Sequence, residues 1–547
     1  MPRVAPGDRK RQYRPKTRRV RRVKCGEERP NCLRCTSTGR PCDGYDVPTF
    51  PSASKLTSSR QNALAKPLVP RPLSDPSYCL FTSDEERRSF QFFLAKTAPQ
   101  LAGDFECAFW GRLLLQSAHH EPAIRHVTVA LGSLHESFER NAGAPFRYGA
   151  NTTSSSFALH QYLRAIRCLR PMPESSQPID VCIISCVLFA CFEAMSGQYG
   201  SAITHVTSGL KILDELRTNP NNGFVSPNVG RTPYIPLDVL CGLFTRLQGQ
   251  VIVTVHRISA ARCNLWPDLV MDLNRPIVFH SLADARETLE VYTYYYRQQS
   301  TELQIQSTQT MSLEPRNSIN PVITVHTAAV ALRDTSLSLL DRWSAALDDF
   351  LRGSGTSLTD RERRATAVLQ LRKIDCFISL DALSPIGEAD TGDHLQWDRH
   401  CAFFEQMVTL GESIVDLNSS SISPSSPLAL SPPKSFSLDL GIVAGMFNVA
   451  IRCRDPHIRR RAVRVLRAAA AQEGVWNSVV AAAIAEKWIE IEEEGLGVVA
   501  SCADVPAVAR LADFVPVFDI EQPGATVYFS RSSRMGQGIV RREVFTW

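Results

Sequence analysis

The sequence predicts a mostly α-helical protein in three parts: a small cysteine-rich module, a flexible linker, and a large all-α domain of stacked helical hairpins. Three observations predict this. Four cysteines gather near the N-terminus at regular spacing, a stretch rich in Pro and Ser follows, and most of the remaining chain repeats apolar residues at the helical period. A chain of 547 residues exceeds a single compact core, so division into several parts is expected.

The cysteine-rich module contains Cys25, Cys32, Cys35 and Cys42, in the pattern C-x6-C-x2-C-x6-C. A C-x2-C pair lets one turn present two thiolates to the same metal ion. Zinc accepts four such ligands in a tetrahedron. Because about 30 residues cannot build a hydrophobic core, a metal would hold this segment together. The spacing therefore predicts zinc as the cofactor.

Positive charge is concentrated in the same part of the chain. Residues 1–46 hold 14 Lys and Arg against 5 Asp and Glu, whereas the remainder holds 47 against 50. A basic arm on a nearly neutral body is typical of nucleic-acid binding, because the cations neutralise phosphates and reach base edges. The basic clusters also suit a nuclear localisation signal.

These residues resemble the fungal binuclear zinc-cluster transcription factors, whose pattern is C-x2-C-x6-C, a loop with Pro, and then C-x2-C-x6-C. The second half is intact here, and Cys25 takes the place of the third cysteine. The resemblance implies that the segment before Cys25 lies on a short helix in the major groove and reads a CGG-type triplet. The implied DNA contacts are Arg18, Arg19, Arg21, Arg22, Lys24 and Arg34.

The resemblance also implies a function and its partners. We expect a sequence-specific regulator of RNA polymerase II genes that acts in the nucleus. Its expected partners are double-stranded DNA and the transcription machinery or co-regulators. Control of a metabolic or secondary-metabolite gene cluster is a common role in this family. Whether such a factor activates or represses is not encoded in the motif.

The first C-x2-C of the family pattern is absent, since the corresponding positions hold Pro15 and Arg18. In the family, six thiolates hold two zinc ions, so the number of zinc ions here is one or two. Three explanations compete. The module is degenerate, or it folds around one zinc held by all four cysteines, or the start of the sequence is misread at a splice junction. We favour the third, because the register is intact from Arg19 onward and fails abruptly before it.

Residues 1–46 are therefore expected to form the basic arm and partial zinc cluster, and residues 47–80 the linker. Six prolines in the linker exclude a long helix, and we find no heptads. No coiled coil is expected there, and both a monomer and a homodimer remain open.

The helical domain is expected over residues 81–510, with a disordered loop at 418–436 and a C-terminal tail at 511–547. Ser83 and the acidic residues after it predict a helix start. The segment EPAIRHVTVALGSLHE, beginning at Glu121, resembles part of the regulatory domain that follows the zinc cluster in many of these factors. Further helices are expected at about 180–195, 198–217, 236–255, 282–304, 322–352, 359–380, 396–417, 455–472 and 475–494.

No motif favours an enzyme, because we find neither a Gly-rich phosphate loop nor a G-x-S-x-G elbow. We interpret Cys182, Cys186 and Cys191 as core thiols rather than metal ligands, because apolar residues surround them. The charged runs Arg459–Arg461 and Glu490–Glu494 are expected on the surface. The longest apolar run is too short to cross a membrane, and no secretory signal is visible.

An alternative function is a nuclear regulatory interaction protein whose degenerate cluster no longer binds DNA specifically. Pro15 and Arg18 motivate this alternative. Such a protein would act through its helical body, for example by pairing with an intact relative.

Overall fold

The structure is a computed structural model that describes most of the chain after residue 79. It divides into two units, Met1–Leu73 and Ser74–Trp547, and every described residue belongs to the second. The cysteine-rich module and the linker up to residue 79 lie outside the described residues. The described ranges are 80–105, 107–140, 153–169, 179–218, 233–254, 263, 265–266, 276–313, 320–353, 358–382, 394–420, 435–519, 522–531 and 538–547.

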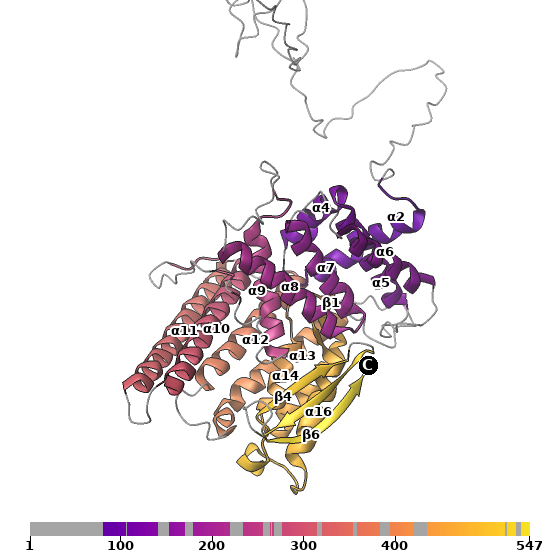
Figure 1. Ribbon diagram of the computed structural model, residues 1–547. Coiled ribbons are helices and arrows are strands. Elements are labelled where there is room, and N and C mark those ends of the chain that lie inside the picture. The colour runs from indigo at the N-terminus through magenta and orange to yellow at the C-terminus, as the bar shows by residue number, and fades with distance from the viewer. Residues whose placement is uncertain are drawn as a thin grey trace, which may run out of the picture. The chain divides into compact units, whose positions relative to one another are not determined.

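The expected helix start at Ser83 is confirmed. The Ser83 side chain accepts a hydrogen bond from the backbone N–H of Glu86 at 3.2 Å, and acidic residues fill the first turn. Helix α5 packs against α2, α6 and α7 (Figure 1). The helical segments of this part are α2 (Asp84–Phe92), a π-helical turn (Phe93–Thr97), α3 (Ala98–Leu101), a second π-helical turn (Phe109–Leu113), α4 (Leu114–His120), α5 (Pro122–Arg140), α6 (Thr153–Leu169) and α7 (Ile179–Met195).

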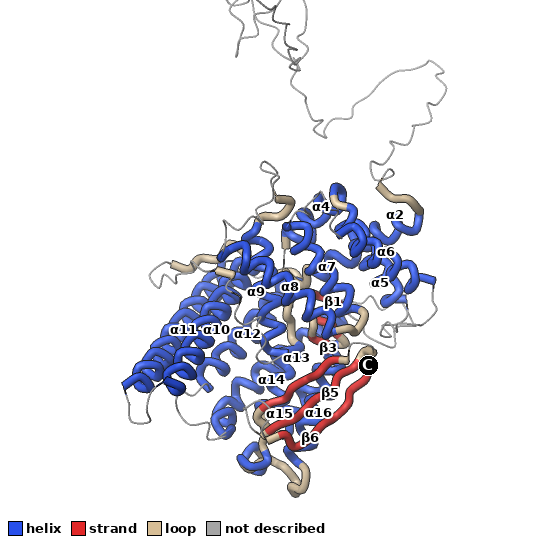
Figure 2. Tube along the Cα trace, in the orientation of Figure 1, coloured by secondary structure: helices blue, strands red, loops and turns tan. Residues whose placement is uncertain are grey.

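The middle of the domain consists of long helices joined in sequence. Helices α10 and α11 lie side by side as a long pair, and α12 packs against both (Figures 1 and 2). The elements are α8 (Tyr199–Thr218), α9 (Leu237–Thr254), α10 (Leu282–Leu313), α11 (Asn320–Gly353), α12 (Asp360–Ala382), a 3-10 segment (His394–His400) and α13 (Cys401–Ser420). The mostly α-helical fold class with packed consecutive helices is thereby confirmed.

Three helices close the helical part, and two small sheets join it. The helices are α14 (Val443–Arg452), α15 (Pro456–Ala469) and α16 (Ser478–Glu493). The first sheet, of order β1-β2-β3, pairs β1 (Ser435–Ser437) in parallel with β2 (Ala471–Glu473), and β2 antiparallel with β3 (Trp476–Asn477). Of the loop expected at 418–436, the last two residues belong to strand β1, and residues 421–434 lie outside the described ranges.

The segment 511–547, expected as a tail, instead forms an antiparallel sheet. Its order is β4-β5-β6, with β4 (Asp513–Phe518), β5 (Gly524–Ser530) and β6 (Ile539–Thr546). Figure 2 shows it as three adjacent strands beside α16. The expectation was wrong because one face of this sheet is part of the core. Val527 and Phe529 are fully buried, and the Phe529 ring lies 6.3 Å from that of Trp488 in α16.

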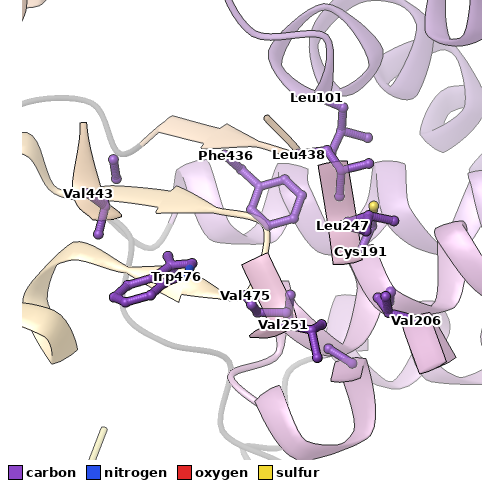
Figure 3. Packing of buried hydrophobic residues seen from close by; sticks show 14 of the residues in the cluster. Leu101, Cys191, Val206, Leu247, Val251, Phe436, Leu438, Val443, Val475 and Trp476 are labelled. Atoms are coloured by element: carbon purple, nitrogen blue, oxygen red, sulfur yellow. The ribbon is translucent and has the colours of Figure 1, made fainter. Parts of the chain in front are cut away.

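The first sheet, β1-β2-β3, packs against the helical core. Figure 3 shows the Phe436 side chain of β1 pointing toward Leu247 and Val251 of α9, with Leu438 beside Leu101. The backbone N–H of Leu438 donates to the carbonyl of Leu101 at 3.2 Å, which ties the strand to the end of α3. Segments more than 300 residues apart in sequence thus share one core.

Among the described helices, none is both long and apolar enough to span a bilayer.

Candidate functional site

The predicted zinc ligands and DNA contacts all lie within residues 1–79, outside the described part of the chain. Within the described ranges, no group of His, Cys, Asp and Glu side chains is arranged to hold a metal ion. The thiol of Cys191 is fully buried, and burial raises the pKa of Cys186 to about 12. Both lie in α7, and the interpretation of these thiols as core residues agrees with their surroundings.

One of the cavities in the described part of the chain lies between segments that are far apart in sequence. It encloses about 520 Å³ where the loop after α3 meets α12, α13 and the β1–β2 region. Its charged lining residues are Asp104, Arg361, Arg364, Asp439 and Glu473. They come from four separate stretches of the chain, so only the tertiary fold brings them together.

Two arginines of α12 in the lining of this cavity contact the loop after α3. Arg364 forms an ion pair with Asp104, with Nε 3.0 Å from Oδ1. Arg361 donates to the backbone carbonyls of residues 103, 104 and 105 at 3.2, 3.1 and 2.9 Å. Burial raises the pKa of Asp104, although Arg364 opposes this. The arginines therefore fix the loop after α3 against α12.

Glu473 of β2 lies on the inner wall. Its carboxylate accepts hydrogen bonds from the backbone N–H groups of Gly441, Ile442 and Val443, at 2.8, 2.9 and 3.1 Å. These groups precede or begin α14, where unpaired N–H groups favour an anion. Burial nevertheless dominates and raises the pKa of Glu473 to about 7.

Asp439 is the third acid of the cavity, and it contacts two buried arginines. Arg246 of α9 places Nε 2.9 Å from Oδ1, and Arg286 of α10 donates to Oδ2. Each acid of the wall thus has arginine or backbone N–H partners within the protein. Such a wall can orient a small polar molecule through hydrogen bonds, and it holds no nucleophile activated by a neighbouring base.

Two charged runs differ from the surface positions expected for them. Arg459 lies in α15 and Glu492 in α16, and both side chains are 0% exposed. Glu492 accepts from Arg454 at 2.7 Å and from Arg459 at 2.8 Å. That expectation was therefore wrong for Arg459 and Glu492, whereas Glu490 and Glu494 are exposed. The physical reason is charge pairing: the buried Glu492 carboxylate lies between two buried guanidinium groups, so each of these charges has an ion-pair partner inside the protein.

The comparison with known families concerns the N-terminal segment. Residues 19–51 match the fungal Zn(2)-Cys(6) binuclear cluster domain. The chain carries a fungal zinc-cluster domain. The matched segment contains all four cysteines predicted as ligands and the basic residues from Arg19 to Lys24. The resemblance inferred from the motif is confirmed, and zinc is the cofactor of this domain.

Two relatives extend the comparison to the body of this zinc-cluster protein. The aspercryptin biosynthesis cluster-specific transcription regulator atnN of Emericella nidulans is 26% identical over 615 residues, covering 97% of this chain and 95% of that protein. Transcription regulator lscL of Purpureocillium lilacinum is 27% identical over 208 residues, covering 37% of this chain and 49% of that protein. No solved structure matches.

Both relatives are named transcription regulators. Together with the zinc-cluster match, they show that this chain is a transcription regulator and not an enzyme. The sequence analysis did not find the cavity, because its lining residues come from separate stretches of the chain and none of them belongs to a motif.

Proposed function

We propose that this protein is a sequence-specific DNA-binding regulator of RNA polymerase II genes, whose zinc cluster reads CGG-type triplets. One observation carries the proposal: the matched zinc-cluster segment joins its cysteines directly to a run of arginines and lysine. Arg and Lys donate to O6 and N7 of guanine, which suits a G-rich site. The proposed contacts are Arg18, Arg19, Arg21, Arg22, Lys24 and Arg34.

The proposed zinc ligands are Cys25, Cys32, Cys35 and Cys42. With Pro15 and Arg18 in place of the first two cysteines, four thiolates match the closed site of one zinc ion, and two ions would need further ligands. We propose residues 1–46 as the DNA-binding module, which acts in the nucleus. Residues 47–80 would be the linker, and the folded body that follows would contact co-regulators.

A metabolic role follows from a relative. The regulator of Emericella nidulans is named for one biosynthesis cluster, and the similarity extends over nearly the whole of both chains. We propose that this chain likewise controls a biosynthetic gene cluster. Deletion of its gene, followed by transcript profiling, should change a contiguous set of biosynthetic genes. Scattered changes with no affected cluster would contradict this part of the proposal.

Zinc content and DNA preference together test the central proposal. We would measure zinc per chain on the full-length protein and its affinity for duplexes with intact and scrambled CGG triplets. We expect bound zinc and a preference for the intact triplet. Cys32→Ser should abolish the preference, whereas Cys107→Ser, which changes a cysteine of the helical body, should retain it.

The alternative function is a nuclear interaction protein that no longer reads DNA, and the residues at positions 15 and 18 favour it. It predicts no zinc, equal affinity for intact and scrambled duplexes, and binding that falls steeply with salt. In that case Cys32→Ser would change nothing. The two proposals therefore give opposite outcomes in the same experiment.

A further inference from the structure

The cavity beside α12 is lined by a stripe of side chains from that helix. Arg361, Arg364 and Val368 all belong to the lining, and they lie three and four positions apart in sequence. Residues at this spacing share one face of a helix, each about one turn from the next. The lining therefore passes along α12 from two guanidinium groups to an apolar side chain.

The two guanidinium groups keep hydrogen-bond donors that the described residues do not use. Arg364 bonds to Asp104 through Nε, and no described residue accepts a hydrogen bond from its Nη1 or Nη2. Arg361 uses Nε and Nη2 for the backbone of the loop after α3, which leaves its Nη1 without an acceptor in the described part of the chain. The Arg364 side chain is only 19% exposed, so a ligand in the cavity would compete there with little bulk water.

The acids of the lining differ from these arginines, because each acid already has partners inside the protein. Glu473 accepts three backbone N–H groups, and Asp439 contacts two buried arginines. Asp104 forms its ion pair with Arg364. The spare donors of α12 therefore favour a ligand group that accepts hydrogen bonds. A carboxylate matches a guanidinium group best, because its two oxygens accept two parallel N–H bonds.

The far end of the lining suits an apolar group. Val368 of α12, Ile414 of α13 and Ile442, which directly precedes α14, line the cavity and are nearly fully buried. The cavity volume of about 520 Å³ lies in the range of small-molecule sites. Such sites usually combine apolar walls with a few polar groups that fix the orientation of the ligand. The cavity thus has one end for a carboxylate and one end for a hydrocarbon.

We propose that this cavity binds a small organic acid, with its carboxylate on Arg364 and Arg361 and its apolar part against Val368 and Ile414. Arg361 also holds the loop after α3, so the bound acid would contact an arginine that already joins this loop to α12. Binding to the folded state alone would stabilise the body. The proposal concerns the helical body and holds whether or not the zinc cluster reads CGG triplets.

Three probes separate the carboxylate from the apolar chain: hexanoate has both, hexanamide lacks the charge, and acetate lacks the chain. We would titrate each probe into the full-length, zinc-loaded protein and measure its affinity by saturation-transfer NMR. Hexanoate should bind about tenfold or more tightly than hexanamide or acetate, because only hexanoate uses both ends of the cavity. No binding of hexanoate at millimolar concentration, or equal binding of hexanoate and hexanamide, would overturn the proposal.

Two variants locate the binding. Arg364→Gln should weaken hexanoate binding about ten- to hundredfold, because a charge-assisted hydrogen bond is lost. Arg363→Gln changes the neighbouring arginine, which is outside the lining and pairs with Asp360, so it should bind hexanoate as the parent does. Equal affinities in Arg364→Gln and the parent would refute the site. If Arg364→Gln fails to fold by circular dichroism, Arg361→Gln, which retains the pair of Arg364 with Asp104, gives the same test.

Discussion

The buried acid between α15 and α16 gives a stringent test of the folded body. Glu492→Gln removes the negative charge that pairs with Arg454 and Arg459, while it nearly keeps the volume of the side chain. All three side chains are 0% exposed, and the carboxylate oxygens lie 2.7 and 2.8 Å from the two guanidinium groups. The variant would therefore leave buried Arg454 without its ion-pair partner, and buried Arg459 with only Glu493, at 3.7 Å.

The expected loss of stability is large. Removal of one partner from a buried ion pair costs about 3–5 kcal/mol. Glu492 also accepts the backbone N–H of Leu511 at 2.9 Å, which holds the segment leading into β4. We would compare urea unfolding of the full-length protein and the variant by far-UV circular dichroism. The transition of the folded body should move to clearly lower urea in Glu492→Gln.

A matched control lies on the same helix. Glu490→Gln makes the same chemical change at a side chain that is 62% exposed and pairs only with Lys487, at 2.7 Å. Surface pairs contribute about 0–1 kcal/mol, so this variant should unfold nearly as the parent does. Equal losses in the two variants would refute the reasoning that burial makes Glu492 important.

The pH dependence of stability in the parent and in Glu492→Gln tests whether Glu492 is ionised in the folded protein. Burial disfavours the Glu492 carboxylate, but Arg454 and Arg459 outweigh it, so the net pKa of Glu492 is lowered. A lowered pKa stabilises the fold above the ordinary pKa of Glu, and this stabilisation is lost as the pH falls through the lowered value. The difference in stability between the parent and Glu492→Gln should therefore shrink on acidification. A difference that grows on acidification would contradict the ionised pair.

Three further predictions concern the wall of the cavity, the backbone and the DNA contacts. Burial raises the pKa of Glu473, so the parent should lose stability, of the order of 3 kcal/mol, as the pH rises from 4.5 to about 7. Glu473→Gln should remove this loss. Urea unfolding of both proteins at pH 5 and pH 8 measures it, and equal pH profiles for the two proteins would contradict it. Gly474→Ala should lower the free energy of unfolding by about 1–3 kcal/mol, because φ is +56° and the new Cβ would lie 1.9 Å from Oε1 of Gln250. Gly242→Ala, inside α9 with open space around it, should be neutral or stabilising. Thermal unfolding of both variants measures the difference. Arg22→Ala should weaken binding to CGG-containing duplexes by about 1–3 kcal/mol and relax the preference for guanine. Competition binding measures both effects. An unchanged preference would show that Arg22 does not contact the bases.

Most of the helical body could be predicted from local pattern. The long apolar run of α7 was expected at 180–195 and is observed at Ile179–Met195. Helix α12 was expected at 359–380 and is observed at Asp360–Ala382. These helices could be found because the residues that make them amphipathic or apolar are neighbours in sequence, so the period is visible without the fold.

The C-terminal sheet could not be predicted in the same way. Strand β6 alternates polar and apolar residues weakly, because it lies at the edge of the sheet, and Val544 is 65% exposed. In its partner β5, Val527 and Phe529 are buried, and the Phe529 ring packs against Trp488 of α16. The last residue is held similarly, since Nε1 of Trp547 donates to the carbonyl of Gly197 at 3.0 Å. These contacts join residues that are tens to hundreds of positions apart, so a local pattern does not reveal them.

The sequence by itself determined the class of this protein. The cysteine spacing and the adjacent basic run occupy fewer than 30 residues, and their chemistry is local: thiolates close in sequence can reach one metal ion, and clustered cations meet phosphates. The tertiary structure alone decided the rest. Glu492 between two arginines and Glu473 at the start of α14 both join residues from separate elements. In each case the chemistry of a group depends on burial and on neighbours, and packing sets both.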